Sequence, residues 1–78
     1  MDKATAIKKL SRHIEVALEC YSASEVDIVV DDCQKTIDIM YHSRHNSFPI
    51  FSNVCPSDCF TEPELSDIAY SYDIGYQI

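Results

Sequence analysis

Two stretches of the chain alternate apolar and polar residues with a period of two, which is typical of half-buried β-strands. The apolar positions are Val26, Ile28 and Val30 in the first stretch and Ile37, Ile39 and Tyr41 in the second. The link between them, residues 31–34, is short and polar, as hairpin turns are. The sequence therefore predicts an antiparallel β-hairpin over residues 25–43, with one apolar and one acidic face.

Residues 3–21 instead repeat apolar side chains every three or four positions, which predicts an amphipathic helix. The apolar stripe is Ala4, Ile7, Leu10, Ile14, Ala17, Leu18 and Tyr21, and the opposite face carries Lys8, Arg12, Glu15 and Glu19. Such a charged face is usually the solvent-exposed side of the helix. The alternative is that it contacts an acidic surface, including that of a second copy of the protein.

Two shorter elements follow the hairpin. Residues 50–54 have the composition of a third strand, and Pro49 places it at a sheet edge because proline cannot donate a ladder hydrogen bond. Thr61 and Glu64 form a T-x-x-E capping box with Pro63 in the first turn, which predicts a second helix over residues 62–72. Gly75 is placed to end that helix.

The end of the chain, residues 65–78, fits two patterns. Leu65, Ile68, Ala69 and Tyr72 have helical spacing, but from Tyr70 onwards apolar and polar residues alternate as in a strand. We expect the helix to end near residues 70–72 and an extended tail to join the sheet.

These elements predict an α+β fold. A long N-terminal helix packs on a small antiparallel sheet, made of the hairpin 25–43 and a possible third strand 50–54, with the short second helix near 62–72. At 78 residues the chain is expected to form a single domain, 1–78, with a small core, because such a chain buries only about 60% of its unfolded surface.

Charge is the strongest compositional signal, with a formal net charge of −7 at neutral pH. Residues 46–78 contain no lysine or arginine and five carboxylates, namely Asp58, Glu62, Glu64, Asp67 and Asp73. Direct binding to nucleic acid, itself a polyanion, is disfavoured for this part. A basic partner is attracted to such a surface instead.

The expected location is the cytoplasm. No apolar run approaches the ~20 residues of a membrane span, and no apolar signal-peptide core follows the N-terminal lysines. The four cysteines are therefore interpreted as thiols rather than disulfides.

One cluster has residue types that suit a metal: His42, His45, Cys55 and Cys59. Imidazole nitrogens and thiolates are the ligands that tetrahedral zinc prefers. The spacing is not that of a known zinc finger, so we expect no metal and no cofactor. A small zinc-stabilised adaptor module is kept as an alternative.

Catalysis is not expected. The single glycine, Gly75, excludes a phosphate-cradling loop, and no catalytic motif surrounds a cysteine. The stretch 64–70, ELSDIAY, resembles a helix of helix-turn-helix proteins, which implies a small transcriptional regulator as a second alternative. No recognition helix follows it, and its acidic surroundings disfavour DNA.

The remaining feature is the acidic side of the hairpin. We expect its carboxylates to form the partner-binding surface: Glu25, Asp27, Asp31, Asp32 and Asp38. A carboxylate-lined face can imitate nucleic-acid phosphates and occupy a basic groove of a protein or ribonucleoprotein complex. The functional hypothesis is a non-enzymatic inhibitor of a nucleic-acid-handling complex, of the phage or mobile-element anti-CRISPR or anti-restriction type.

A homodimer is also expected. Seven apolar residues exceed what one small core can cover: Phe48, Ile50, Phe51, Tyr70, Tyr72, Tyr76 and Ile78. A leftover aromatic patch usually marks an interface.

Overall fold

The computed structural model describes residues 1–42, 45 and 47–77. Two helices, four strands and two short 3₁₀ helices follow in the order α1 (Lys3–Cys20), η1 (Ala23–Glu25), β1 (Val26–Asp31), β2 (Thr36–Tyr41), β3 (Ile50–Pro56), η2 (Ser57–Cys59), α2 (Glu62–Tyr72) and β4 (Gly75–Gln77). The predicted end of the hairpin, Ser43, and the last residue of the tail, Ile78, lie outside the described residues.

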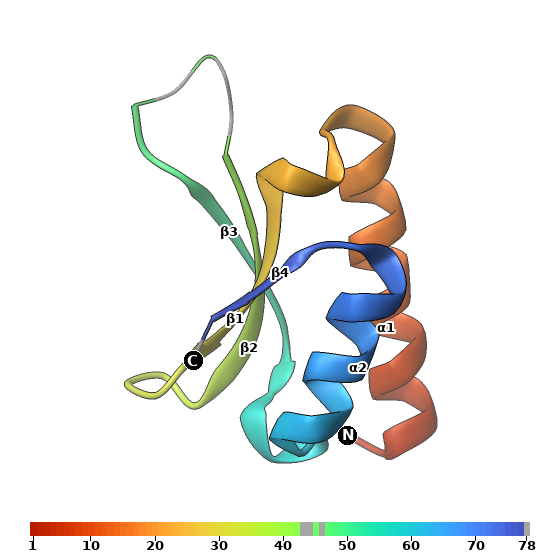
Figure 1. Ribbon diagram of the computed structural model, residues 1–78. Helices are drawn as coiled ribbons and strands as arrows, with labels where there is room; N and C mark the ends of the chain where they lie inside the picture. The colour runs from red at the N-terminus through yellow and green to blue at the C-terminus, as the bar shows by residue number, and fades with distance from the viewer. Residues whose placement is uncertain (43–44, 46, 78) are drawn as a thin grey trace.

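The fold has two layers, and the predicted α+β class is confirmed. The strands form one sheet in the order β3-β2-β1-β4, and both helices pack on the same face of it (Figure 1). β1, β2 and β3 are antiparallel neighbours as expected, whereas β4 lies parallel to β1. The sheet is therefore mixed rather than purely antiparallel, because the chain crosses over through α2 before it adds its last strand.

The hairpin pairs in the register that the alternating pattern requires. Ile28 lies opposite Ile39, and both are completely buried beneath the helices. The turn is held by Asp31, whose Oδ1 accepts hydrogen bonds from the backbone nitrogens of Cys33 (2.9 Å) and Gln34 (3.0 Å). Lys35 completes the turn with a positive φ of 58°.

β3 extends two residues beyond its predicted end because it contains a β-bulge. Cys55 pairs with Ile37, but the next pair joins Asn53 to Asp38, which leaves Val54 without a direct partner. A bulge changes which face of the sheet the side chains after it point to. Val54 and Cys55 are consequently both buried in the core.

α1 and α2 cover different halves of the sheet. α1 buries Ala6, Leu10, Ile14 and Ala17 and lies mainly against β3, whereas α2 lies against β4 and β1. Asp2 caps α1 by accepting a hydrogen bond from the Thr5 nitrogen at 2.7 Å, and this bonding lowers the pKa of the Asp2 carboxyl.

The predicted capping box of α2 is confirmed. The Thr61 nitrogen donates to Glu64 Oε1 at 2.8 Å, and the Glu64 nitrogen donates to Thr61 Oγ1. The expectation for the other end of this helix is wrong. Asp73, not Gly75, adopts the left-handed conformation that ends α2, with φ at 59°, and Gly75 begins β4. The tail thus joins the sheet, as its alternating pattern indicated.

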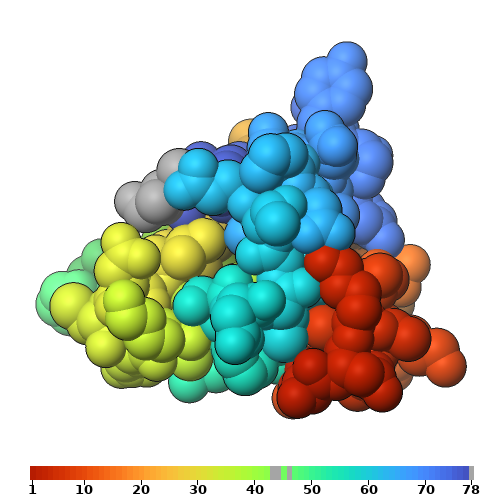
Figure 2. Space-filling model, turned by 90° about the horizontal axis from the view of Figure 1, so that it is seen from below, coloured from red at the N-terminus to blue at the C-terminus, as the bar shows by residue number. Residues whose placement is uncertain are grey.

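The starts of the two helices are held together by Lys3. Its Nζ lies 2.6 Å from Glu64 Oε2, donates to the Cys59 carbonyl at 2.9 Å and sits 4.5 Å from the centre of the Phe60 ring. Figure 2 shows this end of the molecule, where η2 lies between the start of α1 and the β1–β2 turn.

Candidate interaction surface on the open face of the sheet

One face of the sheet carries the helices, and in the described part of the chain no helix covers the other (Figure 1). Because side chains alternate along a strand, the residues between the buried positions point to this second face. We call it the open face. Its residues are Asp27, Val29, Asp31, Thr36, Asp38, Met40, Phe51, Asn53 and Gln77.

Asp38 is the unusual residue of the open face, because it is only 4% exposed although none of the described helices and strands lies over it. Val29 and Asn53 flank it on the neighbouring strands, and Thr36 and Met40 flank it along β2. These side chains surround the carboxylate and remove it from water. Burial raises the pKa of the Asp38 carboxyl, and the charge of Asp31 adds to this effect, while the Thr36 hydroxyl partly opposes it.

Asp38 Oδ1 and Thr36 Oγ1 are both buried and make no hydrogen bond of normal geometry within the described structure. The Thr36 hydroxyl nevertheless lies close enough to the carboxylate to lower its pKa, so the contact between the two side chains is a weak one. An unsatisfied buried polar group costs roughly 1–3 kcal/mol, so each such group calls for an explanation. In the sequence, Thr36 stands two residues before Asp38, so the alternation along a strand already places the two side chains on the same face.

The Asp27 carboxylate, unlike that of Asp38, has polar partners on or beside the neighbouring strands. Its Oδ2 accepts a hydrogen bond from Gln77 Nε2 at 3.0 Å and lies 3.1 Å from His42 Nε2. The carboxylate lies directly over Gly75, where the Cβ of any other residue would overlap Oδ1. The single glycine of the chain thus makes room for Asp27, a function that its sequence position did not reveal.

The other three predicted carboxylates have different settings. Asp31 is on the open face and bonds the turn backbone, and Asp32 is exposed at the tip of the turn. Glu25 lies before β1, where its carboxylate accepts from the nitrogen and hydroxyl of Ser22 and caps η1. The structure therefore brings Asp27, Asp31 and Asp38 together on the open face and leaves Glu25 and Asp32 at opposite ends of β1.

The three carboxylates of the open face form a triangle. Asp27 and Asp31 are four residues apart on β1, a separation of about 13 Å along the strand. Asp38 lies on β2 opposite Val29, midway between them. Strand spacing places its backbone about 8 Å from that of each of the other two. At this spacing three separate cationic side chains can each meet one carboxylate, through charge-assisted hydrogen bonds.

The four candidate zinc ligands are not assembled into one site. Cys55 pairs with Ile37 near the turn, whereas His42 follows the far end of β2, about 16 Å away along the strand. Burial raises the pKa of the Cys55 thiol to about 11, with the adjacent Cys59 thiol adding to the shift, so Cys55 is a protonated thiol. Among residues 1–42, 45 and 47–77, no group of three or more potential ligands could hold a metal ion. All four cysteines carry free thiols.

Comparison with known proteins gives no information on function. No protein-family model, curated protein or solved structure matches this chain. Within the described residues, no helix has the length and apolar character needed to cross a membrane.

Proposed function

We propose that this protein is a non-enzymatic inhibitor that acts in the cytoplasm by binding a basic surface of a nucleic-acid-handling protein or ribonucleoprotein. The observation that carries the proposal is Asp38, a buried carboxylate with an unpartnered oxygen on the open face. The class of partner follows from the chemistry of the open face and from the net charge of −7. Anti-CRISPR and anti-restriction proteins of phages and mobile elements act in this manner.

A basic partner satisfies the groups that the free protein leaves unsatisfied. An arginine presents five N–H donors in a planar fork, enough to reach Asp38 Oδ1 together with an oxygen of Thr36 or Asp31. Its positive charge also offsets the repulsion between Asp31 and Asp38, which contributes to the raised pKa of Asp38. Net negative charge accelerates the encounter with a basic surface and makes its rate depend on salt.

The two alternative functions have no specific structural support. The zinc-stabilised adaptor needs four ligands at one site, but the four candidate ligands are not assembled into one site. The transcriptional regulator needs a recognition helix, but α2 is followed by β4.

Self-association stays a prediction. Tyr72 and Tyr76 pack against the core and Ile78 lies outside the described residues, but the other four residues behind it are exposed, namely Phe48, Ile50, Phe51 and Tyr70. Inhibition by the open face does not depend on a second copy of the chain.

The test is inhibition of DNA cleavage by a panel of purified CRISPR effector complexes and restriction endonucleases. We expect the wild-type protein to inhibit at least one of them, with potency that falls as salt rises from 50 to about 200 mM, because exposed charges are then screened. Asp38→Asn removes one charge from the open face and should weaken inhibition about tenfold.

Asp67→Asn is the matched control, because it removes the same charge from the exposed surface of α2. It should inhibit as well as the wild type. Absence of inhibition across the panel, or an equal loss in both variants, would refute the proposal.

A further inference from the structure

The outer edge of β3 is a second candidate binding surface, in addition to the open face. β3 is the edge strand of the sheet, and an edge strand presents unpaired backbone N–H and C=O groups. Edges are commonly protected by charged side chains, but residues 45–57 contain no aspartate, glutamate, lysine or arginine. Phe48, Ile50 and Phe51 are instead exposed by 79%, 39% and 51%.

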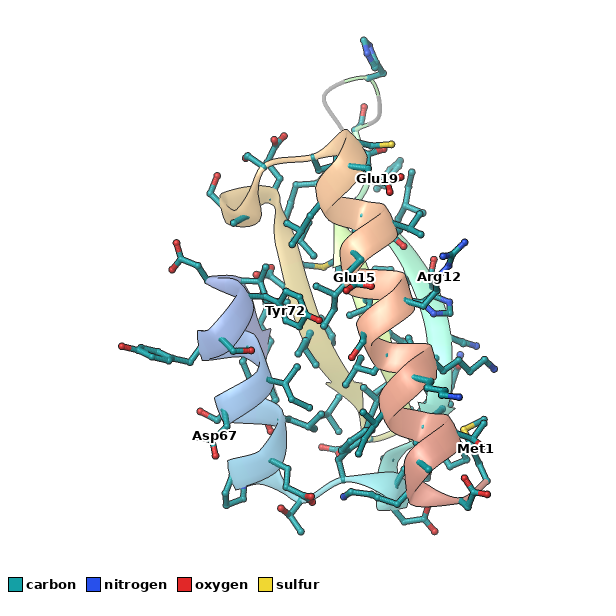
Figure 3. The ribbon with its side chains drawn as sticks, turned by 90° about the vertical axis from the view of Figure 1, so that its right-hand side faces the viewer. Met1, Arg12, Glu15, Glu19, Asp67 and Tyr72 are labelled. Atoms are coloured by element: carbon teal, nitrogen blue, oxygen red, sulfur yellow. The ribbon has the colours of Figure 1, made fainter. Side chains whose placement is uncertain are left out.

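Cations of this acidic chain lie along the same edge. α1 packs against β3, and its Lys9 lies close enough to Cys55 of β3 to act on the pKa of that thiol. Arg12 and His13 line a hollow of about 150 Å³ with Val16 and Tyr41. Tyr41 pairs with Ile50, so this hollow opens at the start of β3. Figure 3 shows Arg12 on the side of α1 next to β3, whereas Asp67 lies on α2 at the other side of the molecule.

A third cation lies at the other end of the strand. Lys35 lines a second hollow, of about 270 Å³, with Pro56, Ser57 and Asp58. The edge is thus uncharged in itself, apolar at its start and flanked by positive charge on α1, whereas at the β1–β2 turn Lys35 is accompanied by the carboxylates of Asp32 and Asp58.

We propose that β3 accepts an extended segment of a partner protein as a fifth strand, and that this segment carries alternating acidic and apolar side chains. The unpaired edge provides main-chain hydrogen bonds, as in other cases of strand addition. Side chains of the added strand on the helix side meet Lys9 and Arg12, which favours carboxylates. Those on the other side extend the open face beside Phe51, which favours apolar residues.

The charges favour this occupant over a second copy of the chain. β3 itself carries no carboxylate, and a paired second copy would bring a second Lys9 and Arg12 to the edge, where like charges facing each other are destabilising. Its α1 would also bring Glu15 and Glu19, so the sedimentation experiment described below separates the two occupants. An acidic segment offsets the positive charges instead.

The test uses a fluorescent peptide of about eight residues, the length of an ordinary strand, in which glutamate alternates with valine and isoleucine. Fluorescence anisotropy with the full-length protein should show saturable binding. A matched peptide with lysine in place of glutamate should bind at least tenfold more weakly. Amide chemical shifts in NMR spectra should change along residues 50–56.

Two matched charge reversals locate the site. Lys9→Glu should weaken binding of the glutamate peptide about tenfold, whereas Lys8→Glu, on the solvent side of α1, should have little effect. Asp38→Asn should bind the peptide normally, because Asp38 lies on β2, one strand inward from this edge. The proposal is overturned by no binding to the wild type, by equal binding of the lysine peptide, by equal effects of the two reversals, or by a stable dimer in sedimentation experiments that excludes the peptide.

Discussion

Substitution of Gly75 by alanine tests the contact between the first and last strands. An added Cβ at this position would overlap Oδ1 of Asp27 but would lie 3.7 Å from the Asp27 Cβ, an ordinary contact distance. The strand backbone can therefore stay in place, and the Asp27 carboxylate must move. It then loses its hydrogen bond with Gln77 and its contact with His42.

The expected cost follows from these two bonds. A hydrogen bond to a charged group contributes about 1.5 kcal/mol or more, and the half-exposed His42 contributes less, so their loss costs about 2 kcal/mol. Replacing glycine recovers about 0.5 kcal/mol by restricting the unfolded chain. We expect Gly75→Ala to lower the free energy of unfolding by about 1.5 kcal/mol. In a domain of this size the melting temperature falls by about 4–8 °C per kcal/mol.

A double-mutant cycle measured by urea unfolding and circular dichroism gives the decisive result. Asp27→Ala alone loses the same bonds and should cost about 2 kcal/mol. Once the carboxylate is absent, Gly75→Ala should recover about 0.5 kcal/mol, which gives a coupling of about 2 kcal/mol between the two sites. Asp67→Ala, on the exposed surface of α2, should change stability by less than about 0.5 kcal/mol. Additive effects of the two substitutions, or an unchanged stability in Gly75→Ala, would refute this account of Gly75.

Three further predictions concern the other contacts. Asp38→Asn should stabilise the protein at pH 7 by about 1 kcal/mol, because it removes a buried charge. The folded-state pKa of Asp38 is raised, so this gain should vanish below pH 3.8, where the carboxyl is protonated in both states, and a gain that persists in acid would contradict the reasoning. The bonds from Lys3 and Thr61 lower the pKa of Glu64 to about 2, so their stabilisation is present above pH 4.5 and lost as pH falls towards 2. Urea unfolding at several pH values should show a smaller acid-induced loss in Glu64→Gln than in the wild type. Mass spectrometry after brief alkylation at pH 8 should find exposed Cys20 and Cys33 modified and buried Cys55 intact, and rapid labelling of Cys55 would contradict its raised pKa.

The elements of this fold were predictable because each has a strong local pattern. The period of two placed β1 and β2, the spacing of apolar residues placed α1, and Thr61 with Glu64 placed the start of α2. Contacts between distant residues had no such signal. The parallel pairing of β4 with β1 depends on a crossover that strand patterns do not encode, and the extension of β3 depends on a bulge at Val54.

The candidate site was predictable only as a set of charges. Alternation correctly placed Asp27 and Asp38 opposite the buried stripe. It could not show that Asp38 would be buried by its neighbours, because that depends on which residues of β1 and β3 lie beside it. Nor could it show that Asp27 bonds to Gln77, since that residue lies 50 residues away.

The short last strand also protects the protein from aggregation. β1, with the sequence VDIVVD, lies inside the sheet only because β4 pairs with its second edge. Before residues 75–77 pair with β1, that edge is open and rich in β-branched side chains, the type of segment that pairs with other chains. Asp27 and Asp31 interrupt the apolar run and oppose such pairing by charge repulsion. Asp27 and Asp31, which we propose as part of a partner-binding surface, thus also oppose the association of the growing chain with its neighbours.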